Sequence, residues 1–379
     1  MIDGLDGLEG IVAAETVLSE VDGEAGRLVI RGCSLDQLSG RVSYEDVVHL
    51  LFDGFFDELR EAGDLAAALG RARAEVFAEV QALDSRLLGL GTTEAVRALM
   101  ARLPDGDDLH TALKLVAAPA VFTPAVSRAR QGLAPIAPDA ASGHARDLLR
   151  MIKGRAPTEA EAAGLDAYLV TVCDHGLNAS TFAARVVAST RAGLTSAALA
   201  GISALKGPLH GGAPGPIIEM LDEIGTPENA QRWLEAALDR GDRLMGFGHR
   251  IYRVRDPRAD ALKRAVSRLV NDGSNSTPGR LEFAEAVEQA ALAVLKARKP
   301  NRSLQTNVEL YTALLLEALA FPPDAFTCVF ATGRISGWMA HAREQQAGGR
   351  LIRPQSRYVG PEPRGGGLGE RRLTRRRIE

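Results

Sequence analysis

The sequence contains few of the features that mark membrane, secreted or nucleic-acid-binding proteins. Only 3 of its 379 residues are cysteine, and aromatic residues make up 5%. Cys33, Cys173 and Cys328 are far apart, and their spacing matches no metal-binding motif. Because each lies among apolar neighbours, we expect reduced thiols and a cytoplasmic protein without a metal site.

Long apolar runs and a strong excess of one charge are also missing. No apolar stretch continues uninterrupted for the length that a bilayer requires, so we expect no transmembrane helix. Residues 1–6 are acidic and lack the basic and apolar regions of a signal peptide. The formal net charge of -3 at pH 7 gives no general attraction to nucleic acid or anionic lipid. We therefore expect neither a nucleic-acid partner nor a membrane partner.

The chain has enough apolar residues for a large core, with 46% hydrophobic and 25% charged residues. Its length accommodates two lobes. The one clear hairpin signal is at residues 21–32, where Asp22-Gly23 and Gly26 bracket a turn before the apolar run 28–30. Beyond it, apolar residues recur at helical spacing and strands do not alternate with helices. We predict a mainly α-helical protein with a short N-terminal β-hairpin.

Capping signals mark several helix boundaries. Thr158 opens a capping box, and Thr226 followed by proline predicts another helix start. Asn307 is placed to cap a helix that runs through residue 319, and Asp324 to start one through residue 347. The tail 361–379 is rich in glycine and arginine and poor in apolar residues, so we expect it to be a disordered basic tail.

The most distinctive segment is 245–258, which reads Met-Gly-Phe-Gly-His-Arg-Ile-Tyr-Arg-Val-Arg-Asp-Pro-Arg. Its glycines permit conformations that other residues resist, and they let the backbone approach a ligand closely. Several arginines follow His249, and guanidinium groups suit carboxylates and phosphates. This concentration of cations beside one imidazole predicts a site for a polyanionic substrate.

Two further histidines stand in loops at predicted helix ends. His210 lies in the word Lys-Gly-Pro-Leu-His-Gly-Gly. A loop anchored on rigid elements is typical of functional residues, although a plain turn also fits this pattern. His175 fits a site role, but also a structural role in which the helix macrodipole favours it. The remaining histidines are interpreted as structural or surface residues: His49, His110, His144 and His341.

Two charged residues stand in apolar surroundings. Arg334 lies among small residues that indicate close helix packing, where a charge is costly unless it is paired. Either an internal carboxylate or a ligand carboxylate must meet it. Glu309 falls in the first turn of a predicted helix, where it fits both a capping contribution and a general base.

Six residues in a characteristic order carry a resemblance to a known family: His175, His210, His249, Glu309, Arg334 and Arg353. With the words around them, the sequence from residue 7 to about residue 360 resembles citrate synthases of the shorter bacterial and archaeal type. The resemblance implies a two-domain helical fold and a homodimer with shared active sites. It places a large domain at 1–212 and 312–360, and a small domain that closes over acyl-CoA at 213–311.

The resemblance also implies a reaction, in which acetyl-CoA condenses with oxaloacetate and citryl-CoA is hydrolysed to citrate and CoA. Glu309 is implied to remove a methyl proton, neutral His210 to donate a hydrogen bond to the thioester oxygen, and His249 to polarise the ketone. The residues implied to bind oxaloacetate are His175, Arg258, Arg334 and Arg353 of the partner subunit. Arg253 matches a position that meets CoA phosphate. Acetyl-CoA is a substrate here, and no cofactor is implied.

The chain departs from the family pattern at two places. Glu309 replaces the usual aspartate, which moves the carboxylate by about a bond length, and such a misplacement can cost about 100-fold in rate. After His210, prolines 214 and 216 replace part of the usual Ala-Asn-Glu word and change how the next helix starts. Two alternatives therefore stay open. One is a 2-methylcitrate synthase, which would use propionyl-CoA and differs by only one methylene. The other is a non-catalytic paralogue that binds CoA or dicarboxylates.

Overall fold

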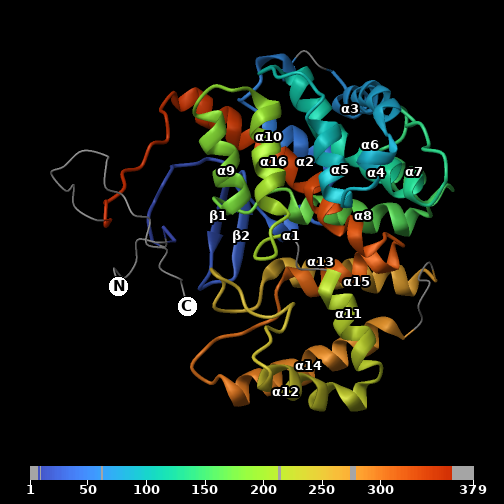
Figure 1. Ribbon diagram of the computed structural model, residues 1–379, viewed down its shortest axis with the longest axis vertical. Coiled ribbons are helices and arrows are strands. Elements are labelled where there is room, and N and C mark those ends of the chain that lie inside the picture. Colours follow the sequence, from blue (N-terminus) through green and yellow to red (C-terminus); the bar gives the residue numbers. More distant parts are fainter. Residues whose placement is uncertain (1–6, 9, 61–62, 212–214, 274–278, 361–379) are drawn as a thin grey trace, which may run out of the picture.

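A computed structural model describes residues 7–8, 10–60, 63–211, 215–273 and 279–360 (Figure 1). The predicted mainly α class with a small N-terminal sheet is confirmed. The predicted basic tail and Pro214 lie outside the described residues. The prediction of residues 213–311 as a separate closing domain stays a prediction.

The N-terminal sheet is antiparallel, with strands β1 (Ser19–Asp22), β2 (Arg27–Ile30) and β3 (Cys33–Ser34). Ser19 pairs with Ile30 and Asp22 with Arg27, which leaves residues 23–26 as the predicted turn. The carboxylate of Asp22 accepts the amides of residues 24 and 25 and thereby closes this turn. The sequence did not predict β3, because two residues carry no detectable strand pattern.

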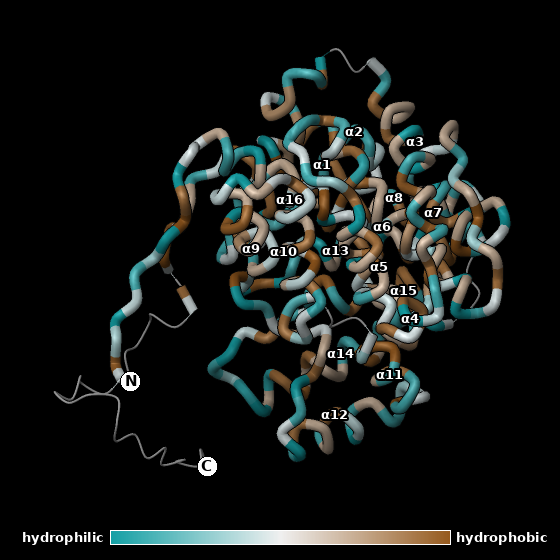
Figure 2. The backbone as a smooth tube through the Cα atoms, turned by 45° about the horizontal axis from the view of Figure 1, so that its top comes forward, coloured by the Kyte–Doolittle hydropathy of each residue, from teal (hydrophilic) through white to brown (hydrophobic). Residues whose placement is uncertain are grey.

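Most helices form one large body in the upper part of Figure 1. Its helices are α1 (Leu35–Leu38), α2 (Tyr44–Phe52), α3 (Leu65–Val76), α4 (Ser85–Leu88), α5 (Thr92–Met100), α6 (Leu109–Arg130), α7 (His144–Lys153), α8 (Glu159–Val172), α9 (Ala179–Ala188), α10 (Leu194–Leu205) and α16 (Phe326–Gly348). Two short 3-10 helices, Asp57–Arg60 and Phe77–Ala82, connect them. Figure 2 shows hydrophobic positions along the interior helices and hydrophilic positions on the outer turns.

Helix α6 forms the centre of this body and packs against α3, α5, α7 and α16. Within the described residues it is the one helix with the length and composition of a membrane span. However, 89% of its most apolar window is buried inside the protein, as expected for a core helix. Lys114 and two prolines interrupt the apolar run of this helix, so the sequence alone predicted no membrane span there.

Three helices lie in the lower part of Figure 1: α11 (Gly215–Ile224), α12 (Ala230–Asp239) and α14 (Arg280–Arg298). Helices α13 (Pro257–Asn271) and α15 (Val308–Ala318) connect the two parts, since each packs against the other and against α8. Helix α11 starts at Gly215, with the second proline of the altered loop, Pro216, in its first turn.

Most predicted boundaries are confirmed, and two are shifted. The Thr158 capping box opens α8, and the Asn307 side chain caps α15. The helix expected from Thr226 begins instead as a 3-10 turn, Pro227–Asn229, and the threonine side chain makes no capping bond. A second 3-10 turn, Pro323–Ala325, delays the start of α16 to Phe326. In both cases a proline favours a tight first turn.

Candidate active site

The glycine-rich segment forms an irregular loop between α12 and α13. Gly246 and Gly248 have φ angles of 87° and 82°, which strongly favour glycine. The Gly248 amide donates to the carbonyl of Gln305 (2.7 Å), and the Asn307 amide donates to the carbonyl of Gly246 (3.0 Å). The Asn307 side chain donates to the carbonyl of Gly248 (2.9 Å). These bonds bring the loop of His249 against the start of α15.

Three aromatic rings meet at this loop. The centroids of His175 and His249 lie 5.5 Å apart in an edge-to-face arrangement. The Tyr252 hydroxyl lies 3.2 Å from Nε2 of His175, and its ring centroid lies 4.7 Å from that of His249. Nδ1 of His249 accepts the amides of Ile251 and Tyr252 at 3.1 and 3.0 Å. In the neutral ring the proton is therefore on Nε2.

Arg258 faces this imidazole from the first turn of α13. Its guanidinium forms a buried ion pair with Asp256, with Nε–Oδ1 and Nη2–Oδ2 distances of 3.0 and 2.7 Å. Asp256 also caps α13 by accepting the Arg258 amide. Nη2 of Arg258 lies 3.4 Å from Nε2 of His249. Since both of these nitrogens are donors, they suit an acceptor oxygen shared between them.

Helix α16 approaches the end of α8 very closely. A Cβ atom on Gly333 would lie 2.6 Å from the Val172 side chain, and one on Gly337 would lie 2.3 Å from the Cys173 carbonyl oxygen. Glycine at these positions therefore confirms the close helix packing that the small residues indicated. This packing brings Arg334 against Val172, the last residue of α8, three residues before His175 in the loop that follows.

Arg334 is a buried cation whose guanidinium is only partly satisfied. Its Nε donates to the carbonyl of Val172 (2.6 Å), while Nη2 is buried and has no hydrogen-bond partner within the described residues. Its charge lies 4.9 Å from the centroid of the Phe330 ring. Burial lowers the pKa of Arg334 to about 10, so the group stays protonated at neutral pH. Of the two predicted partners for this charge, the geometry favours a ligand carboxylate.

His210 approaches the site from the loop after α10. Its Nε2 lies 2.8 Å from Oγ of Ser180, which also receives a hydrogen bond from Nε1 of Trp338 (3.2 Å). The ring lies in edge contact with Phe330, with centroids 6.3 Å apart. Ser180 is in the first turn of α9, while Trp338 and Phe330 are in α16, so two helices orient this imidazole.

All three site histidines are neutral at neutral pH. Burial, together with the charges of Arg334 and Arg258, lowers the pKa of His210 to about 4. Burial and the Arg258 charge also lower the pKa of His249 to about 4. Burial holds the pKa of His175 well below its ordinary value. Uncharged imidazoles beside two fixed arginines can donate hydrogen bonds without adding to the positive charge.

Glu309 shares a small cavity with His210. The cavity has a volume of about 30 Å³, enough for roughly one or two water molecules. The carboxylate atom Oε2 is buried and has no hydrogen-bond partner within the described residues. Burial raises the pKa of Glu309 above its ordinary value, although the charge of Arg258 opposes the shift. A carboxylate with a raised pKa is typical of a general base.

Two predicted residues lie outside this buried cluster. The Arg253 side chain is exposed, while its backbone amide donates to the Gly23 carbonyl (2.9 Å) and its carbonyl accepts the Ser303 hydroxyl. Arg353 is exposed in the irregular segment after α16. No hydrogen bond or ion pair within the described residues joins either guanidinium to the site histidines, although the Arg253 charge helps to lower the pKa of His249. The roles of both arginines stay predictions.

Four residues of the site were not assigned to it from the sequence: Ser180, Tyr252, Asp256 and Asn307. Tyr252 and Asp256 lie within the distinctive segment 245–258, so their position could have suggested a role. Asn307 was predicted only as a helix cap, and it serves as that cap while also binding the loop of His249. No local pattern indicated a role for Ser180, because its contact with His210 depends on tertiary packing alone.

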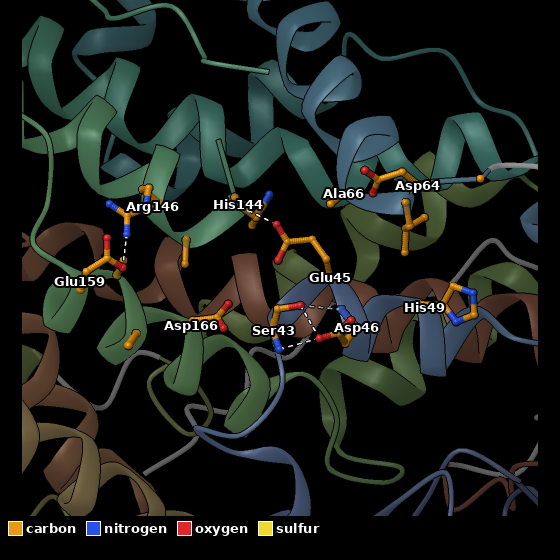
Figure 3. A pocket seen from close by; sticks show the side chains of 16 residues that line it. Ser43, Glu45, Asp46, His49, Asp64, Ala66, His144, Arg146, Glu159 and Asp166 are labelled. Carbon is orange, nitrogen blue, oxygen red and sulfur yellow. Dashed lines mark hydrogen bonds and ion pairs between the residues drawn. The ribbon is translucent and has the colours of Figure 1, made fainter. Parts of the chain in front are cut away.

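A larger cavity, of about 560 Å³, lies elsewhere, among the N-terminal ends of α2, α3, α7 and α8 (Figure 3). Carboxylates line it, and several of them cap these helix ends, as when Glu45 accepts the His144 amide. It contains none of the predicted site residues. Within the described residues, no group of three or more His, Cys, Asp or Glu side chains is arranged to hold a metal ion.

Buried arginines, neutral histidines and a carboxylate of raised pKa together form a site that suits an anionic substrate and a general base. The family model named "Citrate synthase, C-terminal domain" matches residues 7–355, which is most of the 379-residue chain. The protein therefore belongs to the citrate synthase family of transferase-type condensing enzymes.

The relatives carry more than one name. A putative citrate synthase 2 of Mycobacterium tuberculosis is 39% identical over 94% of this chain and 93% of its own length. A 2-methylcitrate synthase of the same organism is 36% identical over 94% of this chain and 91% of its own. The solved structure of Thermoplasma acidophilum citrate synthase, in ternary complex with carboxymethyl coenzyme A and oxaloacetate, matches with a TM-score of 0.82. It is 27% identical and covers 95% of this chain and 97% of that one.

Proposed function

We propose that this protein is a citrate synthase, which condenses acetyl-CoA with oxaloacetate and hydrolyses citryl-CoA to citrate and CoA. The observation that carries the proposal is one cavity lined by both His210 and Glu309. A base of raised pKa and a neutral hydrogen-bond donor at the same cavity are what enolisation of a thioester requires.

Oxaloacetate binds among the buried cations. The unpartnered Nη2 of Arg334 donates to one carboxylate of oxaloacetate, and His175 and Arg258 bind the substrate next to it. The ketone oxygen accepts from Nε2 of His249, the nitrogen that carries the proton in its neutral ring. Arg353 of the partner subunit contributes a further cation, so the active unit is a homodimer. The cytoplasm is the proposed location.

Acetyl-CoA then binds with its phosphate at Arg253 and its thioester oxygen toward His210. Ser180 has one hydroxyl proton and two acceptors within reach, Nε2 of His210 and Oδ1 of Asn178. When Ser180 donates to His210, the imidazole proton is on Nδ1 and is available to the thioester oxygen. Glu309 removes a methyl proton, and the developing enolate charge is stabilised by this hydrogen bond.

The enolate carbon attacks the ketone carbon of oxaloacetate and forms the new carbon–carbon bond. His249 donates a hydrogen bond to the developing alkoxide and helps to protonate it. Water then cleaves the thioester of citryl-CoA, which gives citrate and CoA.

Acetyl-CoA is the proposed substrate in preference to propionyl-CoA. Glu309 extends one methylene further than the aspartate expected at this position, and its cavity is only about 30 Å³. Both features leave little space for the extra methylene of a propionyl group. The 2-methylcitrate synthase among the relatives makes propionyl-CoA the second candidate. A single methylene typically changes the barrier by about 1–3 kcal/mol, so the preference must be measured.

The test is release of free CoA thiol by the purified protein with oxaloacetate and either acetyl-CoA or propionyl-CoA. The proposal expects a higher kcat/KM for acetyl-CoA. A higher value for propionyl-CoA would assign the protein as a 2-methylcitrate synthase. No release with either thioester, from folded protein that binds oxaloacetate, would support the non-catalytic alternative.

A further inference from the structure

The turn of the N-terminal hairpin is packed directly against the loop of His249. The Gly23 carbonyl accepts the Arg253 amide at 2.9 Å. A Cβ atom at Gly23 would lie 2.3 Å from the carbonyl oxygen of Ile251, and one at Gly26 would lie 2.7 Å from the Val254 side chain. More than 220 residues separate the two segments in sequence. Their close contact therefore limits where the backbone of the loop can lie.

The other end of the same hairpin holds the loop of His175. Ser19, the first residue of β1, donates from Oγ to Oδ2 of Asp174 (2.5 Å) and accepts the Gly176 amide (2.9 Å). These two partners are the residues on either side of His175. The single hydroxyl thus fixes the backbone of this short loop from both sides.

Asp174 is also held from the side opposite the hairpin. Nε2 of His341, in α16, lies 3.2 Å from Oδ1 of this carboxylate. Arg185, in α9, lies 2.9 Å from Nδ1 of His341 and forms an ion pair with Glu344. Asp174 is completely buried, and Ser19 and His341 hold its carboxylate from two sides.

We propose that the hairpin is a positioning element that sets the distance between the loops of His175 and His249. Strand β1 runs from Ser19 at one loop to the turn at the other, and a strand of this length is a stiff spacer of about 10 Å. The hairpin contacts the backbone of both loops and does not touch the reacting atoms. It acts by holding His175, Tyr252 and His249 in mutual contact, so that the two histidines are placed to bind oxaloacetate. This inference rests on the proposed function.

Gly23→Ala is the direct test, because Gly23 is not among the residues with positive φ and the three atoms nearest to the new methyl group all belong to Ile251. Gly348→Ala is the matched control, since a Cβ atom there meets nothing within 4 Å. We expect Gly23→Ala to raise KM for oxaloacetate and to lower kcat/KM by about 10- to 100-fold, the scale of a displacement approaching 1 Å. The control keeps the wild-type values.

A second pair of variants tests the other end. Ser19→Ala removes the hydroxyl and is expected to raise KM for oxaloacetate, whereas Ser19→Thr keeps the hydroxyl and restores the wild-type value. A merely structural role would lower the melting temperature and the active fraction, and thus kcat, but would leave KM unchanged. An unchanged KM in both Gly23→Ala and Ser19→Ala would overturn the proposal.

Calorimetric titration with oxaloacetate separates this proposal from the proposed function. If the wild-type protein binds oxaloacetate without releasing CoA thiol, the catalytic assignment fails while the affinities of the variants still decide the role of the hairpin. Weaker binding by Gly23→Ala than by Gly348→Ala supports the positioning role, and equal binding refutes it. A wild-type protein that does not bind oxaloacetate refutes both.

Discussion

Replacing Glu309 by glutamine removes the proposed base and keeps its shape. General base catalysis typically contributes about 10²- to 10⁴-fold, so kcat should fall by that factor, or by about 2.7–5.4 kcal/mol of transition-state stabilisation. KM for oxaloacetate should change little, because the described contacts join Glu309 to the α15 cap and the small cavity rather than to Arg334. The assay is release of CoA thiol from acetyl-CoA at saturating oxaloacetate.

The same substitution should act on stability in the opposite direction. Burial raises the pKa of Glu309 in the folded protein, so its ionised form opposes folding. Protonated Glu309 contributes its full stabilisation below the pKa that this carboxyl has in the unfolded chain. The contribution is lost as the pH rises through its pKa in the folded protein. Glu309→Gln should therefore melt at a higher temperature than the wild type at neutral pH. This difference should shrink as the pH falls toward the ordinary glutamate value.

The matched control is Glu219→Gln, which neutralises an exposed carboxylate in α11. It should change neither turnover nor the pH dependence of melting. Glu309→Asp places the carboxylate about a bond length further back and should lower kcat by less than glutamine does. Near-full turnover in Glu309→Gln would refute the role of Glu309 as base, whatever the melting curves show.

Three further predictions follow from the site geometry. Arg334→Met should raise KM for oxaloacetate at least about 30-fold, since loss of a buried charge contact with a ligand costs about 2–5 kcal/mol. Steady-state kinetics at varied oxaloacetate measures this KM, and an unchanged value would show that Arg334 does not contact the substrate. Ser180→Ala should lower kcat by about 5- to 10-fold, because His210 loses one hydrogen bond of about 1–1.5 kcal/mol. Full activity of this variant, with an unmoved His210 ring in its crystal structure, would contradict the prediction. The pKa values of His210 and His249 are both about 4, so the plot of kcat/KM against pH should show no histidine titration near pH 6.5, the ordinary pKa of histidine. A change of kcat/KM near pH 6.5 that persists in Glu309→Asp would contradict these pKa shifts.

Local signals predicted the parts of the fold and site that depend on neighbouring residues. The positive φ of Gly246 and Gly248, the cap at Asn307 and the turn after Asp22 all follow from residue types within a few positions. The pairing of Arg258 with Asp256 is equally local, because only Pro257 separates them at the start of one helix, although it was not predicted. The resemblance to a family supplied the order of the site residues but not their contacts.

The remaining contacts depend on segments that are far apart in sequence. His210 meets Ser180 only because the loop after α10 folds over the start of α9. The hairpin turn meets the loop of His249 across more than 220 residues. No periodicity or capping rule predicts such pairs, since tertiary packing alone creates them.

Burial acts on the two kinds of titratable group in this site with opposite signs. It raises the pKa of Glu309 and lowers the pKa of His210 and His249 from 6.5 to about 4. The raised pKa makes Glu309 a stronger base toward the substrate methyl group, and the lowered pKa values keep the imidazoles uncharged. The arginines then remain as the fixed charges beside the histidines. A dianionic substrate is attracted to these cations, while the imidazoles stay neutral and able to donate hydrogen bonds to its ketone oxygen and to the thioester oxygen.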